Sequence, residues 1–156
     1  MKIIPLTRGF EAIVDDADYL WLSKYTWHAR PHRNTVYAQT NLADGDGFRT
    51  CQMHRLIMGE PEGQVDHEDL DGLNNVRSNI RLATPSQNMC NKGIQRNNSS
   101  GYKGVGRHAG KWRARIAING KCIHIGYFET AALAAHAYDV RARDLHGKFA
   151  RTNGSK

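Results

Sequence analysis

Residues 65–91, VDHEDLDGLNNVRSNIRLATPSQNMCN, decide the fold and the chemistry of the middle of this chain. The adjacent Asp66 and His67 offer a hard oxygen ligand and a general base. Asn79 and Asn88 add amide oxygens, and almost no apolar run separates these polar residues. The combination is more typical of metal-assisted phosphodiester cleavage than of a hydrophobic core.

The end of this stretch carries the signals of a short helix. Thr84 is a good N-cap, Pro85 occupies the first helical position, and Gln87 completes a T-x-x-Q capping box. Gly93 is the natural stop. The sequence therefore predicts a helix that carries Asn88 near its beginning.

A small strand–loop–helix unit is expected around the polar residues. His67 ends a short strand, residues 80–83 form a second strand, and the helix follows. A divalent ion between the first strand and the helix would touch Asp66 and Asn88. Because asparagine is neutral and the helix dipole disfavours a cation near a helix N-terminus, binding should stay loose until substrate phosphates add charge. Mg²⁺ is usually held in this way, by few protein groups with water and phosphate.

Five short motifs follow one another in order over roughly residues 50 to 93. They are MHRLI (53–57), VDH (65–67), NN (74–75), NIR (79–81) and NMCN (88–91). Together they resemble the HNH endonucleases of the homing, phage-associated type. The resemblance implies a ββα-metal fold, double-stranded DNA as substrate and one divalent ion, Mg²⁺ foremost and Mn²⁺ as the alternative. The third motif position is asparagine here and histidine in many members, which resembles the H-N-N subtype.

The resemblance also implies a role for each matching residue. His67 activates water, and Asn79 orients His67 through its amide oxygen. Asp66 and Asn88 hold the metal ion, which stabilises the leaving 3′ oxygen. Asn74 and two further asparagines are interpreted as structural, bonding the loop backbone around the site: Asn75 and Asn91. For His54, a supporting contact at the site and an ordinary buried histidine are equally compatible with the sequence.

Other classes of protein stay open at this point. An Asp-His pair and a run of Asn, Asp and Gly also occur in ordinary turn-rich loops. A non-catalytic, sequence-specific DNA-binding regulator could retain a degenerate HNH scaffold, and RNA is a minor variant of the substrate. A structural zinc module on Cys51, His54 and Cys90 is disfavoured, because the cysteines are widely spaced and form no CxxC pair.

Charge is distributed unevenly along the chain. The net charge is +7 over 156 residues, and residues 94–156 alone carry twelve Lys/Arg against three Asp/Glu. Residues 51–93 carry four against six, and residues 1–50 carry six of each. A basic block behind an acidic, metal-suited block is what a DNA-cutting enzyme needs, although a solvated cationic surface is the simpler alternative.

The first third of the chain is typical of a β-rich module that extends or buttresses the nuclease core. Strands are expected over 3–6, 10–14, 27–30, 35–42 and 48–52, with a short helix after Asp15 and one or two helical turns over 53–58. Residues 94–101, IQRNNSSG, have the polar, aperiodic composition of a linker. The expected organisation is 1–93 as β-rich module plus nuclease core, 94–101 as linker and 102–156 as a second domain.

The region behind the linker predicts three strands and a helix. Strands are expected over 102–108, 111–118 and 121–128, with Asn119-Gly120 as a type I′ turn, and a helix capped by Thr130 runs to about His146. Strict alternation places Trp112, Ala114, Ile116 and Ile118 on one face of the middle strand. The fold class is therefore α+β, ending in a three-stranded antiparallel sheet packed on one helix.

This second region resembles the AP2/ERF DNA-binding domain. The motifs that carry the resemblance are YKGV (102–105), GKWRA (110–114), IGYF (125–128), TA (130–131) and AHAYD (135–139), with Asn153 near the end. The family places its sheet in the major groove of DNA. The cations assigned to the DNA face, each of which could equally be a solvated charge, are Lys103, Arg107, Lys111, Arg113 and Arg115. His124 and Arg115 replace residues common in the family, so its sequence preference is not carried over.

The sequence also sets expectations about surroundings and assembly. No apolar run approaches the roughly 20 residues of a membrane span, and no apolar signal-peptide core begins the chain. The cysteine usage favours a reducing, cytoplasmic compartment, nucleoid-associated in view of the DNA partner, and a phage origin fits the resemblance. No obligate protein partner is inferred. As a monomer the enzyme is expected to nick, and as a homodimer it could break both strands.

Overall fold

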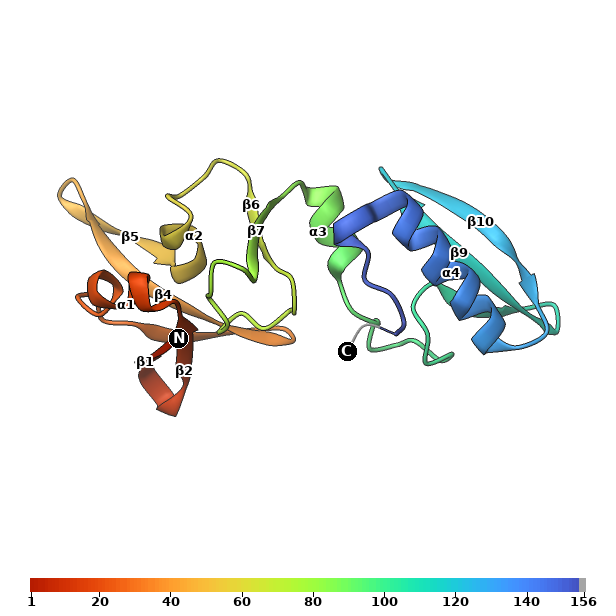
Figure 1. Ribbon diagram of the computed structural model, residues 1–156, viewed down its shortest axis with the longest axis horizontal. Coiled ribbons are helices and arrows are strands. Elements are labelled where there is room, and N and C mark those ends of the chain that lie inside the picture. The colour runs from red at the N-terminus through yellow and green to blue at the C-terminus, as the bar shows by residue number, and fades with distance from the viewer. Residues whose placement is uncertain (155–156) are drawn as a thin grey trace. The chain divides into compact units, whose positions relative to one another are not determined.

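The computed structural model describes residues 1–154 and divides into two compact units, Met1–Ala83 and Thr84–Lys156. Ser155 and Lys156, the end of the predicted second domain, lie outside the described residues. Within that range, helices alternate with several small antiparallel sheets, which confirms the predicted α+β class (Figure 1). None of the helices in residues 1–154 combines the length and the hydropathy needed to cross a bilayer.

The first unit contains three small antiparallel sheets and two short helices. The sheets have the strand orders β1-β2, β3-β4-β5 and β6-β7. The strands are β1 (Lys2–Pro5), β2 (Glu11–Val14), β3 (His28–His32), β4 (Thr35–Asp44), β5 (Gly47–Gln52), β6 (Gln64–His67) and β7 (Ile80–Ala83). The helices are α1 (Asp16–Leu22) and α2 (Met53–Ile57), and a 3₁₀ turn, η1 (Thr7–Gly9), joins β1 to β2.

One hydrophobic core joins these elements. Val14, Leu22 and Met53 are fully buried, and Trp27 lies among them with its Nε1 donating a hydrogen bond to Leu22 O at 2.9 Å. Ile80 of β7 belongs to the same core. Each fully buried side chain of this size stabilises the fold by about 1.5–3 kcal/mol relative to exposure. The N-terminal module and the β6–β7 ladder therefore share one core and form one structural unit.

The long loop between β6 and β7 is anchored by residues distant in the sequence. Gly72 N donates to Thr35 Oγ1 at 2.9 Å, and Ile13 on β2 exchanges hydrogen bonds with Leu73 O and Asn75 N. At the far end of the loop, Arg77 donates two hydrogen bonds of 2.8 Å to the carboxylate of Asp18 on α1. This loop is therefore held by the N-terminal module, in line with the buttressing role predicted for that module.

The second unit consists of a helix, a three-stranded sheet of order β10-β9-β8, and a longer helix that packs on the sheet (Figure 1). Its elements are α3 (Pro85–Asn91), β8 (Val105–His108), β9 (Lys111–Ile118), β10 (Lys121–Phe128), α4 (Ala131–His146) and the 3₁₀ turn η2 (Gly147–Phe149). Ala114 and Ile116 of β9 are buried against α4, as the alternation predicts. The small side chain Ala134 is fully buried at the same interface and allows a close approach.

Local signals in the sequence are confirmed in most elements. Thr84 and Gln87 form the predicted capping box, and Asn119 and Gly120 have φ angles of 48° and 76°, as a type I′ turn requires. Most predicted boundaries agree with the structure to within one or two residues, and the largest difference is at β8, which begins at Val105 and not at residue 102. The unit boundary also differs, because α3 groups with the second unit and not with residues 1–83.

Candidate functional site

Asp66 and His67 end strand β6 and are both buried, each with 5% of its surface exposed. The β6–β7 register pairs Asp66 with Arg81 and His67 with Ile80. Arg81 donates from Nε to Asp66 Oδ2 at 3.1 Å and makes an ion pair with the same oxygen. The sequence interpretation missed this contact, although the ladder register of two such short strands would have predicted it.

The imidazole of His67 is held by groups on three sides. Its Nε2 lies 3.2 Å from Asn75 Oδ1. The ring of Tyr37 lies 5.8 Å away and that of His54 lies 4.7 Å away, edge to face. No local signal marks Tyr37, which comes from β4 in the three-stranded sheet. Burial lowers the pKa of His67 below its usual value, which keeps the ring neutral at physiological pH, as a general base requires.

Asn79 has different partners from those expected. Its Oδ1 accepts a hydrogen bond from Asp69 N at 3.1 Å, and its Nδ2 donates to Asp69 Oδ1 and Asn74 O. The amide of Asn79 therefore closes the loop after β6, and its hydrogen bonds go to Asp69 and Asn74 and not to the His67 ring. The amide oxygen that meets the His67 ring belongs to Asn75. The expectation that Asn79 orients the ring is corrected on that point.

The interpretation of the paired asparagines as structural is consistent with their contacts. Asn75 is fully buried, and its Nδ2 donates to Leu73 O at 3.1 Å and to Gly72 O at 3.4 Å. Asn74 Nδ2 donates to Asp69 Oδ2 at 2.7 Å. Both side chains shape the loop, and Asn75 in addition reaches the candidate base.

His54 lies at the start of α2 and is 4% exposed. Its Nδ1 is buried without a hydrogen-bond partner in the described residues. Burial, with the neighbouring His67 and Arg55 adding to it, lowers the pKa of His54 to about 3. The neutral ring is a packing partner of His67, so the structure places His54 beside the candidate base and not on a separate surface.

The buried His54 predicts that the first unit loses stability in acid. The pKa of a histidine in an unfolded chain is about 6.5. Because the folded pKa is lower, the unfolded chain takes up the proton first, and stability present above pH 6.5 is lost as the pH falls toward the folded value. From about pH 7 to about pH 5, this group should lower the free energy of unfolding by about 2 kcal/mol.

Urea unfolding of the full chain at both pH values tests this expectation, in a Trp112→Phe background whose remaining tryptophans, Trp21 and Trp27, both lie in the first unit and report its unfolding by fluorescence. Between these pH values, the free energy of unfolding should fall by about 2 kcal/mol less in His54→Phe than in the wild type. In His28→Gln, which changes an exposed histidine on β3, it should fall as in the wild type. Equal pH dependence in His54→Phe and the wild type would contradict the assignment.

A metal ion would find a hard carboxylate donor at Asp66. Among residues 1–154, no three His, Cys, Asp or Glu side chains gather into a cation cage. A single carboxylate with water and phosphate oxygens is nevertheless a donor set typical of Mg²⁺, so the chemistry of Asp66 fits such an ion. Bound metal would compete with Arg81 for the same carboxylate. Asn88, the other expected ligand, and Asn91 lie on α3 in the second unit.

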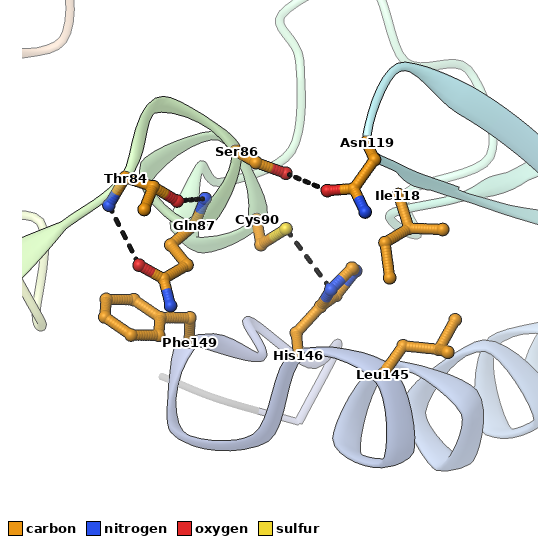
Figure 2. Close-up of a pocket in the computed structure, with 9 residues that line it drawn as sticks. All are labelled: Thr84, Ser86, Gln87, Cys90, Ile118, Asn119, Leu145, His146 and Phe149. Carbon is orange, nitrogen blue, oxygen red and sulfur yellow. Dashed lines mark hydrogen bonds between the residues drawn. The ribbon is translucent and has the colours of Figure 1, made fainter.

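Helix α3 is anchored within the second unit by polar contacts around a pocket of about 200 Å³ (Figure 2). Cys90 Sγ lies 3.3 Å from His146 Nδ1, and Ser86 Oγ donates to Asn119 Oδ1 at 3.4 Å. Burial raises the pKa of the Cys90 thiol and lowers that of His146. Both shifts favour the neutral forms, so the contact is a hydrogen bond between a thiol and a neutral imidazole and not an ion pair of a thiolate.

Lys103, which was predicted to lie on the DNA face, makes its contacts within the second unit. Its Nζ donates to Cys90 O at 2.5 Å and to Lys92 O at 2.7 Å, which caps the C-terminal end of α3. Burial lowers its pKa to about 8. The ammonium group is thus used inside the unit, and Lys103 does not lie on the outer face of the sheet.

The outer face of the sheet, opposite α4, carries part of the predicted cationic set. Arg113 and Arg115 alternate with the buried Ala114, and their cross-strand partners on β10 are Tyr127 and His124. Lys111 shares this face and forms an exposed ion pair with Glu129. His108, which pairs with Lys111 across β8 and β9, stacks on Tyr127, with ring centroids 5.4 Å apart.

Arg107 lies on the opposite face of the sheet. It pairs with Trp112 across β8 and β9, and its guanidinium lies 4.3 Å from the centre of that ring. Because Trp112 packs against the core under α4, Arg107 shares the helix-covered side. The expectation that Arg107 shares a face with Arg113 is therefore corrected.

Comparison with known proteins gives a relative that matches almost the whole length of this chain. An uncharacterized HNH endonuclease of Acanthamoeba polyphaga mimivirus is 41% identical over 154 residues, which cover 94% of this chain and 76% of the viral protein. The chain belongs to the HNH endonuclease family. Protein 3.8 of Escherichia phage T7 is 35% identical over 94 residues, 58% of this chain and 77% of the phage protein.

Plant proteins match a part of this HNH family member. Dehydration-responsive element-binding protein 2A of Oryza sativa is 43% identical over 68 residues, 42% of this chain and 25% of the plant protein. An ethylene-responsive transcription factor of Arabidopsis thaliana is 45% identical over 58 residues, 35% of this chain and 23% of that factor. These matches confirm an AP2/ERF-like domain beside the HNH part. Models of known protein families give no match to the chain.

Proposed function

We propose that this protein is a site-specific, metal-dependent DNA endonuclease of the homing type. The observation that supports the proposal most strongly is the buried Asp66–His67 pair at the end of β6. The His67 ring is held between Tyr37, His54 and Asn75, and its lowered pKa keeps it neutral. A neutral, oriented imidazole beside a hard carboxylate suits hydrolysis of a phosphodiester.

In the proposed reaction, His67 accepts a proton from water, and the water oxygen attacks the scissile phosphorus in line with the 3′ oxygen that leaves. Asp66 and Asn88 are the proposed ligands of one divalent ion, Mg²⁺ or Mn²⁺. When bound, such an ion polarises the phosphate and stabilises negative charge on the leaving oxygen. Asn79 supports the site by closing the loop at Asp69, and His54 supports it by packing on His67. One such site cuts one strand, so a monomer is expected to nick.

The test of the proposal is cleavage of supercoiled DNA that carries candidate target sequences. With Mg²⁺ or Mn²⁺ the wild type should convert supercoiled DNA to nicked circles, and removal of the metal with EDTA should stop conversion. A His67→Ala protein purified in parallel excludes a contaminating nuclease. Tight binding of a target without cutting under any divalent metal would sink the nuclease proposal and leave a DNA-binding regulator.

The second unit is proposed to bind double-stranded DNA through the outer face of its sheet. Arg113 and Arg115 project from β9 on this face, and His124 and Tyr127 flank them on β10. The sequence excess of positive charge falls on the same segment of the chain. Lys111 is proposed as a weaker contributor, because Glu129 already pairs with it.

Arg115→Ala should weaken DNA binding about tenfold and lower the slope of log affinity against log salt by about one. Arg115 is exposed and forms no ion pair among those found in the described residues. Arg141→Ala removes the same charge from an exposed position on α4, the helix that packs on the inner face, and serves as the matched control. Fluorescence anisotropy at several salt concentrations measures both variants. Equal weakening by the two variants would indicate only a general charge effect and contradict the assigned face.

A further inference from the structure

We infer that Asn75 is a positioning residue that fixes the tautomer of His67, so that Nδ1 carries the lone pair that accepts the proton. The catalytic meaning of this inference rests on the proposed function, whereas the tautomer itself does not. The inference deepens the site by replacing Asn79, the expected partner of the ring, with a residue four positions earlier.

The orientation of the Asn75 amide follows from its other partners. Its Nδ2 lies 3.1 Å from Leu73 O and 3.4 Å from Gly72 O. Carbonyl oxygens only accept hydrogen bonds, so the end of the amide that faces them must be the NH₂ group. The reversed amide would place Oδ1 against two carbonyl oxygens and lose both hydrogen bonds. Oδ1 of Asn75 therefore faces His67 Nε2.

The protonation of the imidazole follows from that orientation. An amide oxygen cannot donate, so His67 Nε2 must carry the hydrogen of the 3.2 Å hydrogen bond. In a neutral imidazole only one nitrogen is protonated, and the lone pair is then on Nδ1. Because Asn75 is fully buried, no exposed surface lets water replace its oxygen as the acceptor. With the tautomer fixed, no molecules carry the hydrogen on Nδ1, the form that could not accept a proton from water at that nitrogen.

The N-terminal module holds Asn75 in this position. Asn75 N donates to Ile13 O at 2.8 Å, and Ile13 N donates to Leu73 O at 2.9 Å. On the other side of the loop, Gly72 packs so closely on β4 that a Cβ atom would lie 2.5 Å from Val36 O and 2.6 Å from the Tyr37 ring. Strands β2 and β4 thus place the acceptor of His67, which gives the module a part in the chemistry.

The tautomer is measured directly by nuclear magnetic resonance on the full chain with ¹⁵N-labelled histidine. At about pH 8, where an imidazole with a lowered pKa is neutral, two-bond ¹H–¹⁵N correlations distinguish the protonated from the bare nitrogen of each ring. His67→Gln identifies the signals of His67. The wild type should show His67 in the Nε2–H form. A wild-type ring in the Nδ1–H form would overturn the inference, whether or not the protein cuts DNA.

Asn75→Ala removes the acceptor, and Asn74→Ala is the matched control. The control deletes the neighbouring amide and its bond to Asp69, and keeps the partners of Asn75. In Asn75→Ala, His67 should populate both tautomers, and kcat for cleavage should fall by about 10- to 100-fold at unchanged KM. Asn74→Ala should keep the Nε2–H form. An Asn75→Ala protein with an unchanged tautomer and unchanged kcat would overturn the inference.

Two further outcomes are separable in this design. If Asn75→Ala does not fold, the wild-type spectrum alone decides the tautomer. If the wild type shows the Nε2–H form but cuts no DNA, the contact between Asn75 and His67 stands and the failure belongs to the proposed function.

Discussion

Replacement of His67 by alanine is expected to lower the rate of DNA cleavage by about 10²- to 10⁴-fold, with little change in DNA affinity. The side chain is 5% exposed, lies next to Asp66 and is hydrogen-bonded to Asn75, which fits its proposed role in the chemical step. The loss equals about 3–5 kcal/mol of transition-state stabilisation. Single-turnover cleavage and fluorescence anisotropy, both on the same target DNA, measure the two quantities separately.

The variant must retain its fold for this result to be informative. Removal of the ring leaves Asn75 Oδ1 without its partner and opens a space beside Tyr37, which should cost about 1–3 kcal/mol of stability. Unfolding by urea checks that the first unit remains folded at the assay temperature. His28→Ala removes an exposed histidine from the same unit and should cut at the wild-type rate. Full activity in a folded His67→Ala protein would exclude His67 as the base.

Replacement of Gly104 by alanine is expected to destabilise the second unit by about 3 kcal/mol or more. Gly104 has a φ of 74°, a left-handed conformation that costs a residue with a Cβ atom about 1 kcal/mol. An added Cβ would lie 2.1 Å from the Tyr138 ring of α4 and 2.7 Å from Arg115 O. Neither neighbour can move freely, because Tyr138 is buried and Arg115 O belongs to β9. The helix must therefore shift away from the sheet.

Hydrogen exchange of the full chain measures this effect with an internal control. Amides of β9 should lose protection by about 100-fold or more, whereas amides of β4 in the first unit should exchange as in the wild type. Gly106→Ala is the control two residues further along, on β8, where an added Cβ meets nothing within 4 Å. It should leave β9 protected. Unchanged protection in Gly104→Ala would mean that the close approach of β8 to α4 is wrong.

Asn153 provides a second set of close contacts in the AP2/ERF-like part. Asn153 closes the unit by accepting from Lys103 N at 2.6 Å and donating to Asp139 Oδ1 on α4 at 2.8 Å. Lys103 in turn caps α3, so the helix that carries Asn88 is anchored to the same unit as the sheet. A change that loosens this packing is therefore expected to affect DNA binding and the proposed metal ligand together.

The sequence by itself determined the elements whose signals are local. The capping box at Thr84, the Asn119-Gly120 turn and the alternation along β9 each involve neighbours within a few residues, and the structure confirms them. It also determined the family, because the ordered HNH motifs and the AP2/ERF-like motifs both agree with the relatives. The position of His67 at the end of β6 follows from the same local pattern.

Only the tertiary structure decided which side chain meets which. The sequence interpretation assigned Asn79 as the partner of His67, whereas the structure places Asn75 there. That outcome depends on where Ile13 and Thr35, distant in the chain, hold the loop. Lys103 and Arg115 were both predicted to lie on the DNA face. Lys103 instead caps α3, because carbonyl oxygens at the end of that helix accept its hydrogen bonds. Hydrogen bonds of a loop side chain are set by long-range packing, and a local pattern carries no information about the partner that such packing brings within 3 Å.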